Sequence, residues 1–447
     1  MAVPARPPGA VRRVSETGTR EAHGAFPCID GLRAFAACAV VLCHTAGVSS
    51  LITSTGGAYL AGLRAGVQIF FVISGFVLYR PFAQAHAAGN SGPSLGSYFR
   101  RRFFRIFPAY WLVLTVGFLV GVIELFGVRS TISQFLLVQG YVAQPLRVGH
   151  FIGLIPAWTL VAEVSFYVFL PFYAFTIWWI GHRRPLPAEI TGLFLLFAVG
   201  MASNIWAANS PIPRAVGVLP VNIAPFALGM TLAVCKINIT RGSRAWRWTE
   251  RAFGTPWKSW LVAAVAFSAT VWAIHYPAVL GFFPIPPTTQ MSYLCLIDLM
   301  GVCVVLPAVF GDQFRGAGRR VLRTRPIVFL GIISYGIYLW HVPVIDATLK
   351  FNVYGGRNTH EPRFEFFEVT AVTIALTGLL AIGTWYALEK PLIALSHRPR
   401  LLPPVLRWRR RLAPEAPVAP DALGAPRDPG TSPASDGFVA LESTTSD

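Results

Sequence analysis

The sequence predicts an all-α integral membrane protein with about ten transmembrane helices and both termini in the cytoplasm. Of its 447 residues, 54% are hydrophobic and only 13% are charged, whereas ordinary soluble domains carry about 25% charged residues. The apolar residues gather in runs long enough to cross a bilayer, which takes about 20 residues. Ten such runs lie near residues 29–49, 65–82, 107–127, 158–180, 188–208, 217–235, 259–276, 291–311, 327–348 and 367–388.

The distribution of Lys and Arg predicts the orientation, because basic residues favour cytoplasmic loops. With the N-terminus inside, 30 of the 38 Lys and Arg residues fall in cytoplasmic segments and 7 fall on the other side. The last one, Arg33, lies within the first apolar run. The net charge of +18 is therefore explained by membrane orientation, and no nucleic-acid partner is expected.

The chain divides into one membrane domain and two polar tails. Residues 1–27 are basic and Pro-rich, and we expect a disordered cytoplasmic tail. Residues 28–395 hold all ten apolar runs. Residues 396–447 begin with a basic segment around Trp408, expected on the inner membrane surface, and continue as a disordered cytoplasmic tail. The six cysteines show no paired spacing, so no metal site is expected.

The first apolar run carries two ionisable residues on one helix face. Arg33 and His44 are eleven residues apart, which is roughly 20° past three full turns and about 16 Å along a helix axis. Ionisable groups within a span are costly, and they usually face a bundle interior or a wet cavity. This stripe is the first candidate for a functional site.

Three titratable residues from distant runs fall in one layer of the membrane. At about 1.5 Å per residue, His44, Glu163 and His341 all lie roughly 7 to 9 Å below the outer edge of the hydrocarbon core, with Ser74 slightly deeper. A neutral His can take a proton from a hydroxyl, and a carboxylate can orient the imidazole. The alternative is that each residue only holds helices together through hydrogen bonds. Depth alone leaves open whether these side chains face one another.

Four arginines stand at the cytoplasmic mouth of the third apolar run. Such a cluster sets topology and contacts anionic lipid headgroups. Guanidinium groups are equally suited to gripping phosphates. The spacing favours neither reading over the other for these residues, which are Arg100, Arg101, Arg102 and Arg105.

Six short segments follow one another along the chain: IDGLRAFAACAVVLCH (29–44), GVQIFFVISGFVL (66–78), FRRRFFRIFPAYW (99–111), WTLVAEVSFYVFLPF (158–172), ISYGIYLWHVPV (333–344) and LEKPL (388–392). In content and order they resemble the motifs of the membrane acyltransferase-3 family. The resemblance covers about residues 27–395. It departs from the family pattern at Gln68, where many members have an acidic residue, and at Thr159, where Ser is usual.

The resemblance implies ten transmembrane helices and transfer of an acyl group from cytoplasmic acyl-CoA to a hydroxyl. Carried over residue by residue, it makes His44 the catalytic base, Arg33 its motif partner, and Glu163 and His341 further catalytic residues. The donor, most simply acetyl-CoA, would be held by Arg102 and Arg105 with Arg100 and Arg101 beside them. Substrate contacts are expected from three more residues of these segments, Ser74, Tyr335 and Trp158.

The expected protein is thus a membrane O-acyltransferase of a bacterial inner membrane, surrounded by lipid and acting on a sugar, glycolipid or envelope polysaccharide. Some members of the family carry an extracellular SGNH-type hydrolase domain, and this sequence shows none, so we expect it to act alone or with a partner. One rival is a proton-coupled transporter or flippase that uses His44 and Glu163 as a relay, although no internal repeat supports it. Another is a non-catalytic scaffold.

Overall fold

The computed structural model describes residues 26–49, 51, 56–142, 153–209, 217–274, 287–353 and 362–397. All of them belong to one compact unit, Met1–His397. Within these ranges the regular secondary structure is helical throughout. The two expected tails lie almost entirely outside the described residues.

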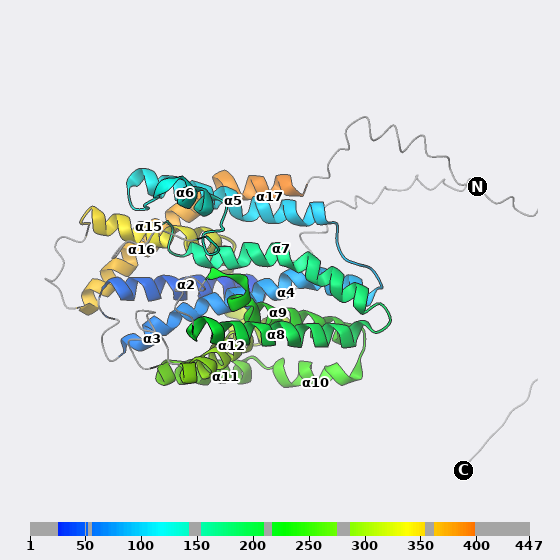
Figure 1. Ribbon diagram of the computed structural model, residues 1–447. Coiled ribbons are helices and arrows are strands. Elements are labelled where there is room, and N and C mark those ends of the chain that lie inside the picture. The colour runs from blue at the N-terminus through cyan, green and yellow to red at the C-terminus, as the bar shows by residue number, and fades with distance from the viewer. Residues whose placement is uncertain are drawn as a thin grey trace, which may run out of the picture. The chain divides into compact units, whose positions relative to one another are not determined.

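Each of the ten expected apolar runs lies wholly or mostly on one helix (Figure 1). These helices are α2 (Cys28–Val48), α4 (Gly66–Ala87), α5 (Leu95–Val120), α7 (Ala157–Ile180), α8 (Pro185–Asn209), α9 (Leu219–Thr240), α11 (Pro256–Ile274), α12 (Pro287–Val309), α15 (Ser334–Lys350) and α16 (Pro362–Thr384). Shorter elements connect them: α3 (Gly57–Gly62), η2 (Leu63–Ala65), α6 (Gly127–Phe135), α10 (Arg244–Phe253), α13 (Ala317–Leu322), α14 (Arg325–Ile332), the π-helix η5 (Trp385–Glu389) and α17 (Lys390–Ser396).

Eight helices of the described part are long and apolar enough to cross a membrane. A ninth span results if α14 and α15, which meet at a bend of 67°, count as one. The helix α11 occupies the expected run 259–276 but is not among these candidates. The structure therefore supports a multi-pass helical protein, while the number ten and the direction of insertion stay predictions.

Two helices differ from the sequence-based expectation in ways that matter for the site. The helix α5 begins at Leu95, well before residue 107, so its arginines lie on the helix rather than in a loop. Long Arg side chains can lay their aliphatic stems along apolar neighbours, so they need not end a membrane helix. The ninth apolar run is broken at Ile333, between α14 and α15. At Gly331, α14 approaches α2 so closely that a Cβ would lie 1.9 Å from the Asp30 carbonyl oxygen.

The helix α4 lies between two apolar cores. Phe71 and Tyr79 belong to the core shared with α5, α7 and α15. Val72 and Phe76 belong to the core shared with α9 and α12. The helix α2 packs against α4, α12, α14, α15 and α16, so its polar stripe is enclosed by other helices.

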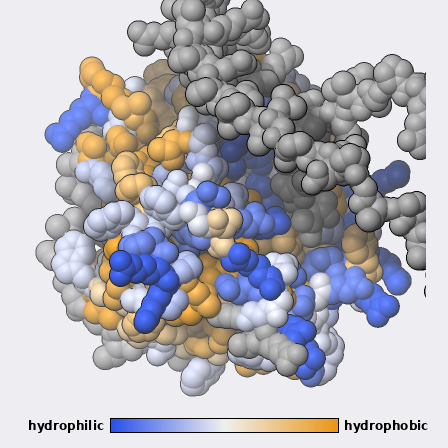
Figure 2. Space-filling view, turned by 90° about the vertical axis from the view of Figure 1, so that its right-hand side faces the viewer, coloured by the Kyte–Doolittle hydropathy of each residue, from blue (hydrophilic) through white to orange (hydrophobic). Residues whose placement is uncertain are grey.

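The helices α5 and α15 run side by side in the same direction. Near the start of α15 and the middle of α5, the Tyr335 hydroxyl donates to the Ile106 carbonyl over 2.8 Å. At their ends, Lys350 Nζ donates to the carbonyls of Val120 and Gly121 over 3.0 and 2.8 Å. We call the side where α5 begins, which carries its arginines, the basic end, and the side where α15 finishes the opposite end. Figure 2 views the basic end, where hydrophilic side chains gather among apolar ones.

Candidate active site

Two histidines, one from α2 and one from α15, lie edge to face inside the bundle. The ring centroids of His44 and His341 are 5.0 Å apart, and the ring planes meet at 80°. Nδ1 of His44 lies 3.0 Å from the Val40 carbonyl oxygen, and Nδ1 of His341 lies 2.7 Å from the Tyr338 carbonyl oxygen. A carbonyl oxygen only accepts, so each Nδ1 carries a proton and each neutral ring keeps a lone pair on Nε2. Both rings can therefore accept a proton at Nε2.

The His341 ring has an unused acceptor in a closed environment. His341 is fully buried, and its Nε2 has no hydrogen-bond partner among the described residues. His44 is only half-buried. A buried polar atom without a partner costs free energy, about 1–3 kcal/mol for a typical group. The two rings expected in one layer do face each other, and the pair offers an acceptor that a substrate could use.

The carboxylate of Glu163 is held by two hydroxyls. Ser74 on α4 donates to Oε1 over 3.2 Å, and Tyr167 donates to the same oxygen over 2.6 Å. No hydrogen bond or ion pair joins Glu163 to His44 in the described part of the chain. The sequence predicts that Glu163 orients the His44 imidazole. In the structure, the hydrogen-bond partner of His44 Nδ1 is instead the Val40 carbonyl oxygen.

A set of hydroxyls connects the level of Glu163 with the level of the histidines. The hydroxyl oxygens of Thr159 and Tyr338 are 2.8 Å apart, and they lie 3.0 and 3.2 Å from the Pro156 carbonyl oxygen. The ring of Tyr338 is 5.6 Å from that of His341, centroid to centroid. Polar groups of α7 and α15 therefore continue from Glu163 towards the histidine pair.

Arg33 and Arg105 form a charged layer nearer the basic end. The guanidinium of Arg33 interacts electrostatically with Arg105 and Glu163, and its buried Nε has no hydrogen-bond partner among the described residues. Arg105 Nη1 lies 3.6 Å from a carboxylate oxygen of Glu389. The Arg105 guanidinium also lies over the ring of Tyr335, 5.8 Å from its centroid. Charged residues of α2, α5 and the π-helix thus converge here.

The side chains of the other three expected donor-binding arginines have different neighbours. Arg102 lies over the ring of Tyr167, 5.8 Å from its centroid, which turns it towards Glu163. Arg101 instead donates to the Ser97 hydroxyl on its own helix. The Nε atoms of Arg100 and Arg102 are buried, and neither has a hydrogen-bond partner in the ranges that the structure covers.

Two expected substrate-contacting residues are packed into the protein. Tyr335 is buried, and its hydroxyl is taken by the Ile106 carbonyl. Trp158 packs edge to face on Phe71, with ring centroids 6.5 Å apart. The third, Ser74, holds Glu163. In this structure all three side chains support the site through contacts with other residues.

Sequence reasoning missed two polar members of the site. Tyr167 lies four residues after Glu163, one helical turn further along α7, and this spacing could have revealed it. Glu389 lies in the LEKPL segment, which contributes to the family resemblance but in which no site residue is predicted. A π-helix that turns a carboxylate inward leaves no simple periodic signal in a sequence.

The polar residues together follow α2 across the bundle. The charged layer surrounds Arg33, Glu163 and its hydroxyls come next, and the histidine pair lies about 16 Å beyond Arg33 along the α2 axis. This polar track starts at the basic end and finishes within the opposite half of the bundle.

A pocket of about 200 Å³ lies at the opposite end. Its walls come from residues 121–124 and 153–155 and from Val342, Pro343 and Asp346 on α15. Val342 directly follows His341, so the pocket begins at the depth of the histidine pair. The Asp346 carboxylate forms no hydrogen bond or ion pair with another described residue, and it is free to bind a hydroxyl.

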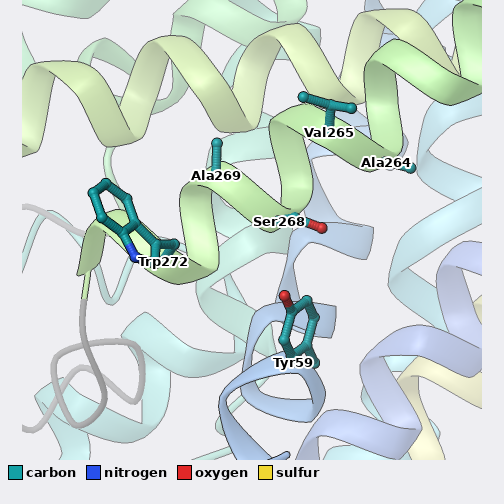
Figure 3. A pocket seen from close by; sticks show the side chains of 6 residues that line it. All are labelled: Tyr59, Ala264, Val265, Ser268, Ala269 and Trp272. Carbon is teal, nitrogen blue, oxygen red and sulfur yellow. The ribbon is translucent and has the colours of Figure 1, made fainter.

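A larger groove of about 480 Å³ lies elsewhere, between α3 and α11. There Tyr59 faces Ser268, and Val265, Ala269 and Trp272 complete the wall (Figure 3). None of the expected site residues lines it. Its apolar lining and open shape are typical of a lipid-facing surface.

Among the described residues, no group of three or more His, Cys, Asp or Glu side chains is arranged to hold a metal ion.

These features define a multi-pass membrane protein with a polar site enclosed by its helices. A family model described as "Acyltransferase domain" matches residues 26–387. The chain belongs to this acyltransferase-3 family. The match confirms the family expected from the six segments.

Bacterial relatives support a multi-pass bacterial membrane protein. Peptidoglycan O-acetyltransferase OatA of Listeria monocytogenes is 25% identical over 74% of this chain and 51% of its own length. Acyltransferase MdmB of Streptomyces mycarofaciens is 25% identical over 84% of this chain and 93% of its own length. The chain thus spans about half of the Listeria protein and nearly all of the Streptomyces one. No solved structure matches this chain.

Proposed function

We propose that this protein moves an acetyl or other short acyl group from cytoplasmic acyl-CoA to a hydroxyl of a carbohydrate or glycolipid in the cell envelope. One observation carries the proposal: a facing pair of histidines ends a polar track whose other end is lined by arginines. Such a track suits a donor that enters at one side of the membrane and an acceptor that enters at the other.

The basic end would hold the phosphates of the donor. Arg102 and Arg105 point into the track, and guanidinium groups bind phosphates through two parallel hydrogen bonds. The pantetheine arm of CoA would extend along α2 past Glu163. The thioester carbonyl carbon would then lie beside the His44 ring.

The transfer step needs one base and one proton shuttle. Nε2 of His44 takes the proton of the acceptor hydroxyl while the oxygen attacks the thioester carbonyl carbon. A new C–O bond forms, the C–S bond breaks, and the sulfur leaves with the proton that His44 returns. While His44 is protonated, Nε2 of the neutral His341 can accept a hydrogen bond from it and share the charge.

The acceptor would enter from the opposite end through the pocket at Asp346. A volume of 200 Å³ equals roughly seven water molecules, enough for part of one sugar ring. The Asp346 carboxylate can accept hydrogen bonds from sugar hydroxyls. The name of the Listeria relative, a peptidoglycan O-acetyltransferase, agrees with a carbohydrate acceptor.

Acyl transfer is favoured over proton-coupled transport by the family match. The test uses purified protein, labelled acetyl-CoA and saccharides extracted from the cell envelope, with saccharide-bound label as the readout. We expect His44→Ala to lower transfer by about 10²- to 10⁴-fold, the usual contribution of a general base. The exposed His182 supplies the control, and His182→Ala should be fully active. A folded His44→Ala protein with undiminished transfer would overturn the assignment of the base.

A further inference from the structure

Glu389 is a buried carboxylate that the proposed reaction does not use. Its side chain is 1% exposed, and neither oxygen has a hydrogen-bond partner among the described residues. Its one close ionic contact in that part of the chain is Arg105, at 3.6 Å. Buried carboxylates normally accept several hydrogen bonds as well as facing a cation. Glu389 thus lacks the hydrogen bonds that a carboxylate in a purely structural ion pair normally accepts.

The π-helix is what turns Glu389 inward. Residues Trp385–Glu389 form one wide turn between α16 and α17. One extra residue in a turn rotates all following residues by about 100° relative to a regular helix. Such turns are frequent at functional sites. The π-helix therefore directs this carboxylate to the arginines of α5 and α2.

The charges around Glu389 are Arg105 of the proposed donor site and its neighbour Arg33 on α2. Arg105 and Arg33 both interact electrostatically with it. The same two arginines repel each other. Two guanidinium groups in a low-dielectric interior are costly without a counter-ion. A carboxylate in this position offsets that cost when no phosphate is present.

We propose that Glu389 is the resident counter-ion of the donor site, which neutralises Arg105 and Arg33 in the empty protein and competes with the donor phosphates for Arg105. This inference rests on the proposed binding of acyl-CoA at the arginines. An anion beside the phosphates weakens their binding, so Glu389 limits the affinity for the product CoA and speeds its release. Glu389 is a positioning residue that acts through Arg105.

A structural brace would behave differently from a resident counter-ion. Glu389 also connects α17 with α5, and a brace alone predicts that Glu389→Gln lowers thermal stability and leaves CoA binding unchanged or weaker. The counter-ion predicts the opposite sign for binding. Removing the negative charge should tighten CoA binding and slow turnover, because the product leaves more slowly.

The experiment measures equilibrium binding of CoA, and turnover of acetyl-CoA, with full-length protein in lipid nanodiscs. For Glu389→Gln we expect the Kd of CoA to fall by about 5-fold or more, in the range of ordinary site-to-site coupling, together with slower turnover. Glu389→Asp, which keeps the charge on a shorter side chain, should show a smaller change in the same direction. Glu368→Gln is the matched control, because Glu368 is an exposed carboxylate on α16, and it should bind CoA as the wild type does.

The outcomes separate this inference from the proposed function. Wild-type protein that does not bind CoA would overturn the donor assignment and the counter-ion with it. If the wild type binds CoA and both Glu389 variants bind it with unchanged or weaker affinity, the counter-ion role of Glu389 is overturned and the donor assignment stands. If Glu389→Gln does not fold, the Kd of CoA for Glu389→Asp shows whether CoA binding becomes tighter or weaker.

Discussion

His44 and His341 face each other with their ring centroids 5.0 Å apart, and both rings donate Nδ1–H to a carbonyl of their own helix. Two neutral rings arranged in this way present two acceptors and no proton between them. A hydroxyl that enters can donate to one ring, and a proton taken by His44 can be shared with the other. The pair is thus a proton-accepting site built from helices that are distant in the sequence.

The first prediction concerns His341. The variant His341→Gln should lower kcat by about 10- to 100-fold, the value of a hydrogen bond to a charged group of about 1.5–3 kcal/mol. The KM for acetyl-CoA should change little, because the donor phosphates bind at the basic end. Steady-state kinetics with purified protein measures both quantities. His182→Gln serves as the control, and an equal rise in KM without a fall in kcat would contradict the role in the transfer step.

The second prediction concerns Arg105. Lys keeps the positive charge at this position but lacks the planar fork that binds phosphate through two bonds. Arg105→Lys should therefore raise the KM for acetyl-CoA by about 10- to 100-fold. Arg320→Lys, an exposed position on α13, should leave it unchanged. If both variants have the KM of the wild type, Arg105 does not contact the donor.

The third prediction concerns the acceptor pocket. Asp346→Asn keeps the shape of the side chain and removes its charge, so each hydrogen bond from a sugar hydroxyl becomes weaker by about 1 kcal/mol. We expect the KM for the envelope saccharide to rise by about 5-fold, with the KM for acetyl-CoA unaltered. Glu368→Gln provides the exposed carboxylate control. A change confined to the donor KM would place the acceptor elsewhere.

The sequence alone predicts much of this site. The eleven-residue spacing puts Arg33 and His44 on one face of α2, and depth counting puts His341 level with His44. The ring contact confirms that His44 and His341 lie at one level. Depth counting succeeds here because the helical rise is nearly constant within a regular span.

Other features escape such counting because they depend on tertiary packing. The direction of the Glu163 side chain, towards Ser74 and Tyr167, follows from how α7 packs on α4. The 67° bend before Ser334 lies beside the close approach of Gly331 to α2, a packing contact that no periodic pattern predicts. Glu389 is directed inward by a π-helix, which breaks the regular period on which sequence patterns depend.

In the proposed function, the acyl group crosses the bundle from donor to acceptor. Proteoliposomes with envelope saccharides trapped inside and labelled acetyl-CoA added outside measure this crossing. We expect labelled saccharide ester in the lumen, formed by the wild type and lost in His44→Ala. Ester that forms only when donor and acceptor share one compartment would contradict transfer across the membrane.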